Sequence, residues 1–150
     1  MNREFVRSRN TADARQIYNH LILCDQSFVP PLSDRVDLLA YAEKLADQSV
    51  CYEAWSGADL IGLIAAYENG SNDVVFITNV SVLPDWQRVG VAAALMDDVL
   101  AHADSANISE IRLEVGIRNS RAETFYLKHG FEVMESSQHM NIMRLRVRRR

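Results

Sequence analysis

The sequence predicts an α/β (α+β) fold: a mixed, mostly antiparallel central sheet of six to seven strands with helices on both faces. Two apolar stripes at helical spacing come early in the chain, and three β-like runs joined by short turns follow as an antiparallel meander. Helices and strands then alternate, which gives a central β-α-β unit with parallel strands and a right-handed crossover. Because the 150 residues contain no internal repeat or low-complexity linker, we expect one domain over residues 1–150.

The first third of the chain is predicted to contain one strand and two helices. Residues 5–8 favour a short strand, and Asn10 or Thr11 is placed to cap a helix over residues 12–25, which two prolines then end. Its apolar stripe has spacings of three and four: Ala14, Ile17, Leu21 and Cys24. A second helix is expected over residues 36–46, with Asp34 as a candidate cap. Its inward positions are Leu38, Leu39, Ala42 and Leu45.

The remaining elements follow from changes of period and from turn residues. The meander strands are expected over residues 50–55, 60–67 and 74–82, with turns at 56–59 and 69–73. The later elements are helices over 91–103 and 120–128 and strands over 108–115, 131–135 and 140–147. Alternating apolar residues in the last strand favour an edge strand whose arginines face water, although the five arginines of residues 143–150 also permit an anion-binding patch.

Composition and charge exclude several classes of function. A net charge of −4 argues against a general nucleic-acid binder, and no apolar run reaches the roughly 18 to 20 residues that a membrane span requires. The four histidines lack metal-binding spacing, so we expect no metal. Cys24 and Cys51 fall on apolar faces and are predicted to be buried small hydrophobes. With no signal peptide at the N-terminus, these features favour a cytoplasmic location.

The stretch from Asn79 to Leu100 carries the clearest chemical signal. A buried strand passes through Pro84 into a tight turn that delivers the N-terminus of a helix. The free amides and partial positive charge of a helix N-terminus suit an anion such as a phosphate. Gly90 permits either an unusual backbone conformation or a close approach of a ligand. A turn that only connects a strand to a helix explains the same residues, so this motif by itself is weak evidence.

Two sequence blocks together resemble the GNAT superfamily of N-acetyltransferases. The first is V-x-V-x-P-x-x-Q-x-x-G-x-A over residues 80–92, which resembles the family's acetyl-CoA signature through Gln87, Gly90 and Ala92. The second is IRLEVGIRNSRAETFYLKHGFEV over residues 111–133, which resembles the family's strand, asparagine, helix, tyrosine and Gly-Phe. Ala92 replaces a commoner glycine, and Val89 stands where a basic or small residue is frequent. The resemblance implies a GNAT-like sheet with a central β-α-β acetyl-CoA-binding unit.

The resemblance also implies which residues bind acetyl-CoA. In the family the strand before the signature is bulged and splays from its parallel neighbour, and its backbone pairs with the pantetheine arm. The acetyl and pantetheine portion would contact Val80, Ser81 and Val82, and Asn119 would contact the cofactor beyond the second strand. The pyrophosphate would lie against the turn and the first residues of the helix: Gln87, Arg88, Val89, Gly90, Val91, Ala92 and Ala93.

Two catalytic roles follow from the resemblance. Tyr126 would donate a proton to the departing CoA thiolate, whereas without the resemblance it reads as a half-buried aromatic residue. Glu114 would accept the proton of the amine, often through water, and the alternative is a surface carboxylate paired with Arg112 or another cation. Alternation places Glu114 and Arg112 on the face opposite Leu113. Glu68 is a reserve candidate for the base.

The expected activity is acetyl transfer from acetyl-CoA to a primary amine of a small molecule, by direct attack in a ternary complex. The connection over residues 25–35 would line the acceptor side, and the alternative is a plain connector between two helices. Acetylation of a protein N-terminus or lysine is the alternative activity, and a non-catalytic acyl-CoA-binding module is the alternative class. We expect neither a nucleic acid nor a membrane as partner, and the resemblance leaves a homodimer open.

Overall fold

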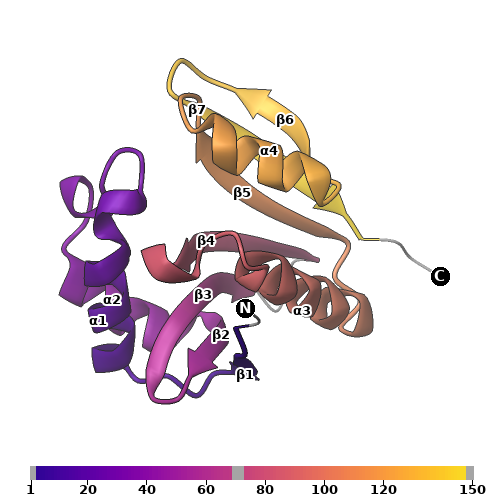
Figure 1. Ribbon diagram of the computed structural model, residues 1–150. Coiled ribbons are helices and arrows are strands. Elements are labelled where there is room, and N and C mark those ends of the chain that lie inside the picture. The colour runs from indigo at the N-terminus through magenta and orange to yellow at the C-terminus, as the bar shows by residue number, and fades with distance from the viewer. Residues whose placement is uncertain (1–2, 69–72, 148–150) are drawn as a thin grey trace.

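The computed structural model describes residues 3–68 and 73–147 and contains one seven-stranded sheet in the order β1-β2-β3-β4-β5-β7-β6 (Figure 1). Strands β4 and β5 are parallel, and the other neighbouring strands pair in antiparallel fashion. The predicted fold class, a mixed and mostly antiparallel sheet with a central β-α-β unit, is therefore confirmed. Most of the predicted turn at 69–73 and the last three arginines lie outside the described residues.

The strands are β1 (Val6–Arg9), β2 (Val50–Ser56), β3 (Asp59–Glu68), β4 (Val74–Val82), β5 (Glu110–Gly116), β6 (Glu132–Ser136) and β7 (Met140–Arg146). The α-helices are α1 (Ala14–Cys24), α2 (Leu38–Gln48), α3 (Val91–Ser105) and α4 (Ser120–Lys128). Three short 3-10 helices complete the chain: η1 (Asp25–Ser27), η2 (Leu32–Asp34) and η3 (Pro84–Trp86).

Helices cover both faces of the sheet, and each face has its own apolar core. Helices α3 and α4 pack on one face, where Leu95, Met96 and Tyr126 join strand residues such as Ile111 and Met143. Helices α1 and α2 pack on the other face, around buried residues such as Ile17, Leu21 and Leu45. Apolar burial on this scale is the main stabilising contribution to a fold of this size. The site described below is lined by residues from both faces of the sheet.

Strands β4 and β5 separate along their length. Their pairing extends only from Val74↔Glu110 to Ile77↔Leu113, so the later residues of both strands have an open edge toward each other. Figure 1 shows β4 and β5 diverging at the centre of the sheet. Because backbone N–H and C=O groups on an open edge need partners, this divergence offers sites for an extended ligand.

A bulge in β4 accompanies the divergence. Opposite Ala65 and Ala66 on β3 stand Asn79 and Ile77, so Thr78 is the extra residue. The hydroxyl of Tyr41 on α2 donates to the Thr78 carbonyl oxygen at 3.0 Å and lies 2.9 Å from the Thr78 hydroxyl. An extra residue shifts the alternation of side chains by one position, so residues beyond Thr78 face the opposite side from the one a regular strand would give them.

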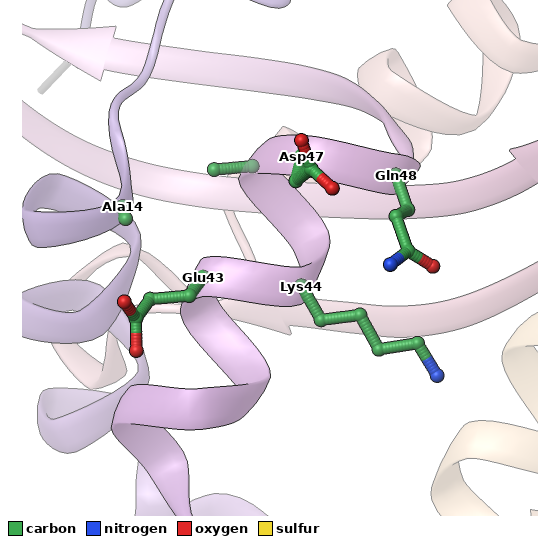
Figure 2. Close-up of a pocket in the computed structure, with 6 residues that line it drawn as sticks. Ala14, Glu43, Lys44, Asp47 and Gln48 are labelled. Atoms are coloured by element: carbon green, nitrogen blue, oxygen red, sulfur yellow. The ribbon is translucent and has the colours of Figure 1, made fainter.

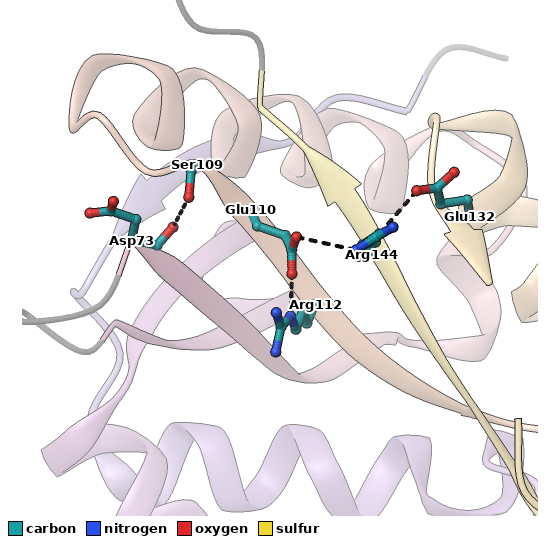
Figure 3. A network of polar contacts seen from close by, with 6 residues as sticks. All are labelled: Asp73, Ser109, Glu110, Arg112, Glu132 and Arg144. Atoms are coloured by element: carbon teal, nitrogen blue, oxygen red, sulfur yellow. Dashed lines mark hydrogen bonds and ion pairs between the residues drawn. The ribbon is translucent and has the colours of Figure 1, made fainter. Parts of the chain in front are cut away.

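Polar contacts hold β4 and β5 together at the opposite end. The Ser109 hydroxyl and amide both donate to the Asp73 carbonyl oxygen, at 2.9 and 2.8 Å. On the other side of β5, Arg144 on β7 links Glu110 of β5 to Glu132 of β6, and Arg112 pairs with Glu110 within β5 (Figure 3). The strands are therefore fixed at this end and open at the other.

Several local predictions were wrong. Helix α1 is capped by Asp13 in a capping box with Gln16, and α2 by Asp37 rather than Asp34. In each case the effective cap is the acceptor whose side chain reaches the amide three residues later. Leu39 is 46% exposed, because the inward stripe of α2 follows Leu38, Ala42 and Leu45, and Leu39 lies to one side of it. The last strand is not an edge strand: β7 lies between β5 and β6. Cys24 and Cys51 are buried and free, as predicted.

Candidate functional site

The open end of β4 and β5 contains a groove with a volume of about 1400 Å³. Twelve of the site residues predicted from sequence line it, which are Val80, Ser81, Val82, Gln87, Arg88, Gly90, Val91, Ala92, Ala93, Glu114, Asn119 and Tyr126. Val89 does not line it and is 42% exposed, because the turn directs this side chain outward. The groove is large enough for an extended ligand of coenzyme size.

The turn after β4 presents the N-terminus of α3 to the groove. Gly90 caps the helix with φ +88°, in the left-handed region, and a Cβ there would have no atom within 4 Å. Glycine is therefore required at position 90 by the backbone conformation and not by crowding from neighbouring atoms. The first helical hydrogen bond runs from the Ala94 amide to the Gly90 carbonyl oxygen, so the amides of Val91, Ala92 and Ala93 have no partner within the helix.

A second glycine sets the position of that helix. A Cβ on Gly62 of β3 would lie 2.5 Å from the Val91 Cγ1 atom and 3.3 Å from the Leu95 Cδ1 atom. Helix α3 therefore rests directly on β3, with its free amides held at a fixed height beside the end of β4. Gln87 adds side-chain contacts from its Nε2 atom to the Val82 carbonyl oxygen at 3.3 Å and the Ser27 hydroxyl at 3.4 Å.

Tyr126 reaches the groove from the face that α3 and α4 cover. It is 8% exposed, and its ring meets Phe125 and Phe131 edge-on at centroid distances of 5.5 and 5.8 Å. Its hydroxyl makes no hydrogen bond with any described residue. Burial raises the pKa of the Tyr126 phenol to about 12, so the group is protonated at neutral pH. The site thus holds an uncommitted hydroxyl donor.

Glu114 lies on the opposite face of β5 from Leu113 and Val115, as alternation predicts. Leu113 and Val115 are buried, whereas Glu114 is exposed in the groove. The alternative partner, Arg112, pairs with Glu110 instead. Glu68 lies with its Oε1 atom 3.1 Å from the Nε2 atom of His102 and is not among the residues that line the groove. Of the two candidate bases, only Glu114 is placed within the groove.

Asn119 has a structural role besides its place in the groove. Its Oδ1 atom accepts from the Ala122 amide at 3.2 Å and caps α4. Its Nδ2 group remains for a ligand. Two arginines that sequence reasoning missed, Arg118 and Arg121, flank the cap and also line the groove.

The connection between α1 and α2 forms one wall of the groove, on the sheet face that these two helices cover. Asp25 accepts from the Ser33 amide at 2.8 Å and the Ser33 hydroxyl at 2.6 Å, which holds the connection as a closed loop. These bonds lower the pKa of the Asp25 carboxyl. A Cβ on Gly116 would stand 3.6 Å from the Val29 carbonyl oxygen, so the loop approaches the end of β5. Phe28, Leu32 and Arg35 line the groove from this loop.

The lining is strongly cationic. Among the residues that line the groove, one is acidic, Glu114, and five carry a positive charge: Arg35, Arg88, Arg118, Arg121 and Lys128. Such a surface attracts anionic ligands. Three of the basic residues come from residues 118–128, and Arg35 and Arg88 come from two distant segments, so a linear charge pattern does not reveal the whole set.

A second depression, of about 620 Å³, lies between the start of α1 and the end of α2. Its residues include Ala14, Glu43, Lys44, Asp47 and Gln48, and Figure 2 shows Glu43 and Lys44 pointing away from one another. The depression lacks convergent polar groups and is a less suitable site than the groove.

Two negative findings hold for residues 3–68 and 73–147. No group of three or more His, Cys, Asp or Glu side chains there is arranged to hold a metal ion. Within the same ranges, no helix combines the length and apolar character needed to cross a bilayer.

Comparison with known proteins identifies the family. An uncharacterised N-acetyltransferase of Mycobacterium bovis is 32% identical over 94 residues, which span 62% of this chain and 60% of that relative. The ribosomal-protein-S18-alanine N-acetyltransferase of Escherichia coli superposes with a TM-score of 0.79 at 18% identity, covering 98% of this chain and 96% of that one. The PaiA N-acetyltransferase of Thermoplasma acidophilum, solved with coenzyme A, gives 0.73 at 14% identity, covering 94% and 99%. Residues 14–131 match the acetyltransferase (GNAT) family, and the chain belongs to it.

Proposed function

We propose that this protein transfers the acetyl group of acetyl-CoA to a primary amine of a small molecule by direct attack in a ternary complex. One observation carries the proposal: residues of the α3 N-terminus, Tyr126 from one face and Glu114 from the other line a single groove. Family membership supports acetyl transfer as the reaction.

Acetyl-CoA suits the groove in shape and charge. Its pyrophosphate would accept from the amides of Val91, Ala92 and Ala93, where the helix dipole favours an anion. Its pantetheine arm would extend along the open edge of β4 at residues 78–82, in the manner of an added strand. The structural neighbour solved with coenzyme A supports this choice of cofactor.

The two faces of the groove would then serve the two proton transfers. The amine nitrogen attacks the thioester carbonyl carbon, a C–N bond forms, and the C–S bond breaks as the tetrahedral intermediate collapses. Glu114, directly or through water, takes the proton that the nitrogen loses. The Tyr126 hydroxyl donates to the sulfur as negative charge develops there. The products are an amide and CoA, with no covalent enzyme intermediate.

A small acceptor fits the enclosed side of the groove. The bonds between Asp25 and Ser33 and the approach of Val29 to Gly116 close the loop against the end of β5. This arrangement restricts access for the surface of a folded protein. A flexible peptide N-terminus still fits, and the E. coli neighbour, by its name, acetylates an alanine of a ribosomal protein.

A CoA-release screen tests the proposal. Purified protein is mixed with acetyl-CoA and a panel of small amines, amino sugars, polyamines and peptides, and free thiol is measured over time. We expect release with at least one small amine, at a higher kcat/KM than with any peptide. A peptide preference would favour N-terminal acetylation instead. Binding of acetyl-CoA without release from any amine would indicate a binding module and contradict the proposal.

A further inference from the structure

A buried polar cluster connects α1 to the open part of β4. It comprises His20 on α1 and Asn79 and Ser81 on β4, which are 2%, 5% and 7% exposed. Asn79 and Ser81 also line the groove. Buried polar groups are costly unless their hydrogen bonds are made, so the arrangement of these bonds is informative.

The bulge at Thr78 is the reason that Asn79 and Ser81 face His20. Before it, Val75 and Ile77 face the core beneath α3, and after it Val80 and Val82 face that core. Asn79 and Ser81 therefore point to the α1 and α2 face. Glu114 lies on that same face of β5, because its neighbours Leu113 and Val115 belong to the α3 side. The amine acceptor would enter between Ser81 on β4 and Glu114 on β5.

The directions of the hydrogen bonds are fixed by chemistry. The Nδ1 atom of His20 lies 2.7 Å from the Leu60 carbonyl oxygen, which can only accept, so Nδ1 carries the proton. Burial lowers the pKa of His20 to about 4, and the ring is neutral at pH 7. Its Nε2 atom therefore accepts, and the Ser81 hydroxyl donates to it at 2.8 Å. Cys24 is a weaker competitor, because its sulfur lies 3.6 Å from Nε2.

Ser81 is left as an acceptor. Its Oγ atom has one proton and two lone pairs. The proton goes to His20, and one lone pair accepts from the Asn79 Nδ2 group at 2.8 Å. The other lone pair has one weak competitor, the Cys24 thiol, which also lies within hydrogen-bond reach of the Ser81 side chain, and Ser81 is among the residues that line the groove. A neutral primary amine has two N–H bonds, so it can donate one to Ser81 and one toward Glu114 while its nitrogen lone pair faces the thioester.

We propose that the Ser81 Oγ atom binds the attacking amine through one N–H, and that His20 is a positioning residue that holds the Ser81 hydroxyl in the accepting orientation. This inference rests on the proposed acetyl transfer. His20 does not take the proton itself, because its Nε2 atom already accepts from the Ser81 hydroxyl. The arrangement selects primary amines, because a secondary amine has one N–H and cannot satisfy Ser81 and Glu114 together.

Variants of His20 and Ser81 separate this role from a structural one. His20→Gln places a carbonyl oxygen near the position of Nε2 and keeps an acceptor for Ser81. His20→Asn keeps a donor near the position of Nδ1 for Leu60 and loses the acceptor for Ser81. Each variant keeps one of the two bonds, so a merely structural histidine predicts similar activity for both.

The assay is CoA release with the amine of the screen that gives the highest turnover, together with its N-methyl derivative. We expect Ser81→Ala and His20→Asn to lower kcat/KM for the primary amine roughly tenfold, the effect of one lost hydrogen bond. His20→Gln should stay within about threefold of the wild type. The preference for the primary amine over its N-methyl derivative should shrink in Ser81→Ala, while acetyl-CoA affinity, measured by calorimetry, stays unchanged.

Several outcomes would overturn the inference. If Ser81→Ala leaves both kcat/KM and the preference for the primary amine unaltered, the proposed contact between Ser81 and the amine is wrong. This variant decides the question if His20→Asn does not fold. Equal activity of the two His20 variants removes the positioning role. If the wild type binds acetyl-CoA and releases no CoA with any amine, the proposed function fails first and this inference with it, which is distinguishable from a failure at Ser81 alone.

Discussion

Replacing Tyr126 with phenylalanine tests the acid role while changing little else. The hydroxyl makes no hydrogen bond with the described part of the chain, and the ring packs edge-on against Phe125 and Phe131. Tyr126→Phe therefore keeps the packing and leaves no unpaired partner. We expect the free energy of unfolding to change by less than about 0.5 kcal/mol, because the Tyr126 hydroxyl, unlike that of Tyr67, is not a fully buried unpaired group. Acetyl-CoA affinity should also remain near its original value.

The size of the catalytic effect follows from the pKa values. A general acid contributes about 10² to 10⁴ in rate. The pKa of Tyr126 is about 12 and that of a thiol about 8.5, so complete proton transfer is uphill by roughly 3.5 pKa units, or about 5 kcal/mol. Hydrogen-bond donation to the developing thiolate is then the larger contribution. We expect kcat to fall about 10²-fold, at the low end of the range.

The assay is continuous CoA release at saturating acetyl-CoA and amine. Tyr67→Phe is the matched control, because the buried Tyr67 hydroxyl also has no hydrogen-bond partner and lies outside the groove lining. Tyr67→Phe should keep its turnover and gain roughly 1 kcal/mol in stability through loss of an unsatisfied group. An unchanged kcat in Tyr126→Phe would refute the acid assignment.

Three further predictions concern the turn, the buried histidine and the base. Gly90→Ala should cost about 1 kcal/mol in stability because of its positive φ, and should weaken acetyl-CoA binding roughly tenfold by calorimetry. Gly57→Ala, also at positive φ but in the β2–β3 turn, should lose similar stability and no affinity. His20 has a pKa near 6.5 in the unfolded chain and near 4 in the folded protein, so between these pH values the unfolded chain binds the proton and the folded protein does not. The contribution of His20 to stability is therefore complete above pH 6.5 and is lost as the pH falls toward 4. Urea unfolding at pH 7.5 and 5 should show a loss about 2 kcal/mol smaller in His20→Gln than in wild type; equal losses would contradict the assigned pKa. Glu114→Gln should lower kcat/KM roughly 100-fold at neutral pH without affecting stability, whereas unaltered turnover would leave deprotonation to water alone.

The fold was largely predictable, for reasons visible in particular elements. The bounds of β4 and α4 agree with those predicted, because Pro84 follows the first closely and Asn119 caps the second. The place of β7 between β5 and β6 was not predictable, since alternation marks a strand without naming its neighbours. The caps Asp13 and Asp37 were missed because several acceptors stand near each helix start.

The site divides in the same way. The residues that follow motif spacing reach one groove, apart from Val89. The His20 and Ser81 contact depends on the bulge at Thr78, and one additional residue in a strand leaves no mark in an apolar and β-branched sequence. Regular alternation would have assigned Ser81 to the core beneath α3. Long-range contacts of this kind require the register of the sheet.

Amide hydrogen exchange with and without CoA tests most directly whether the groove between β4 and β5 binds the cofactor. Ligand binding should slow exchange at Val91, Ala92 and Ala93 and along residues 78–82, where amides of the helix N-terminus and the open strand edge acquire acceptors. Exchange in the β2–β3 hairpin should not change. Binding of CoA that leaves the helix N-terminus and β4 unprotected would contradict the account.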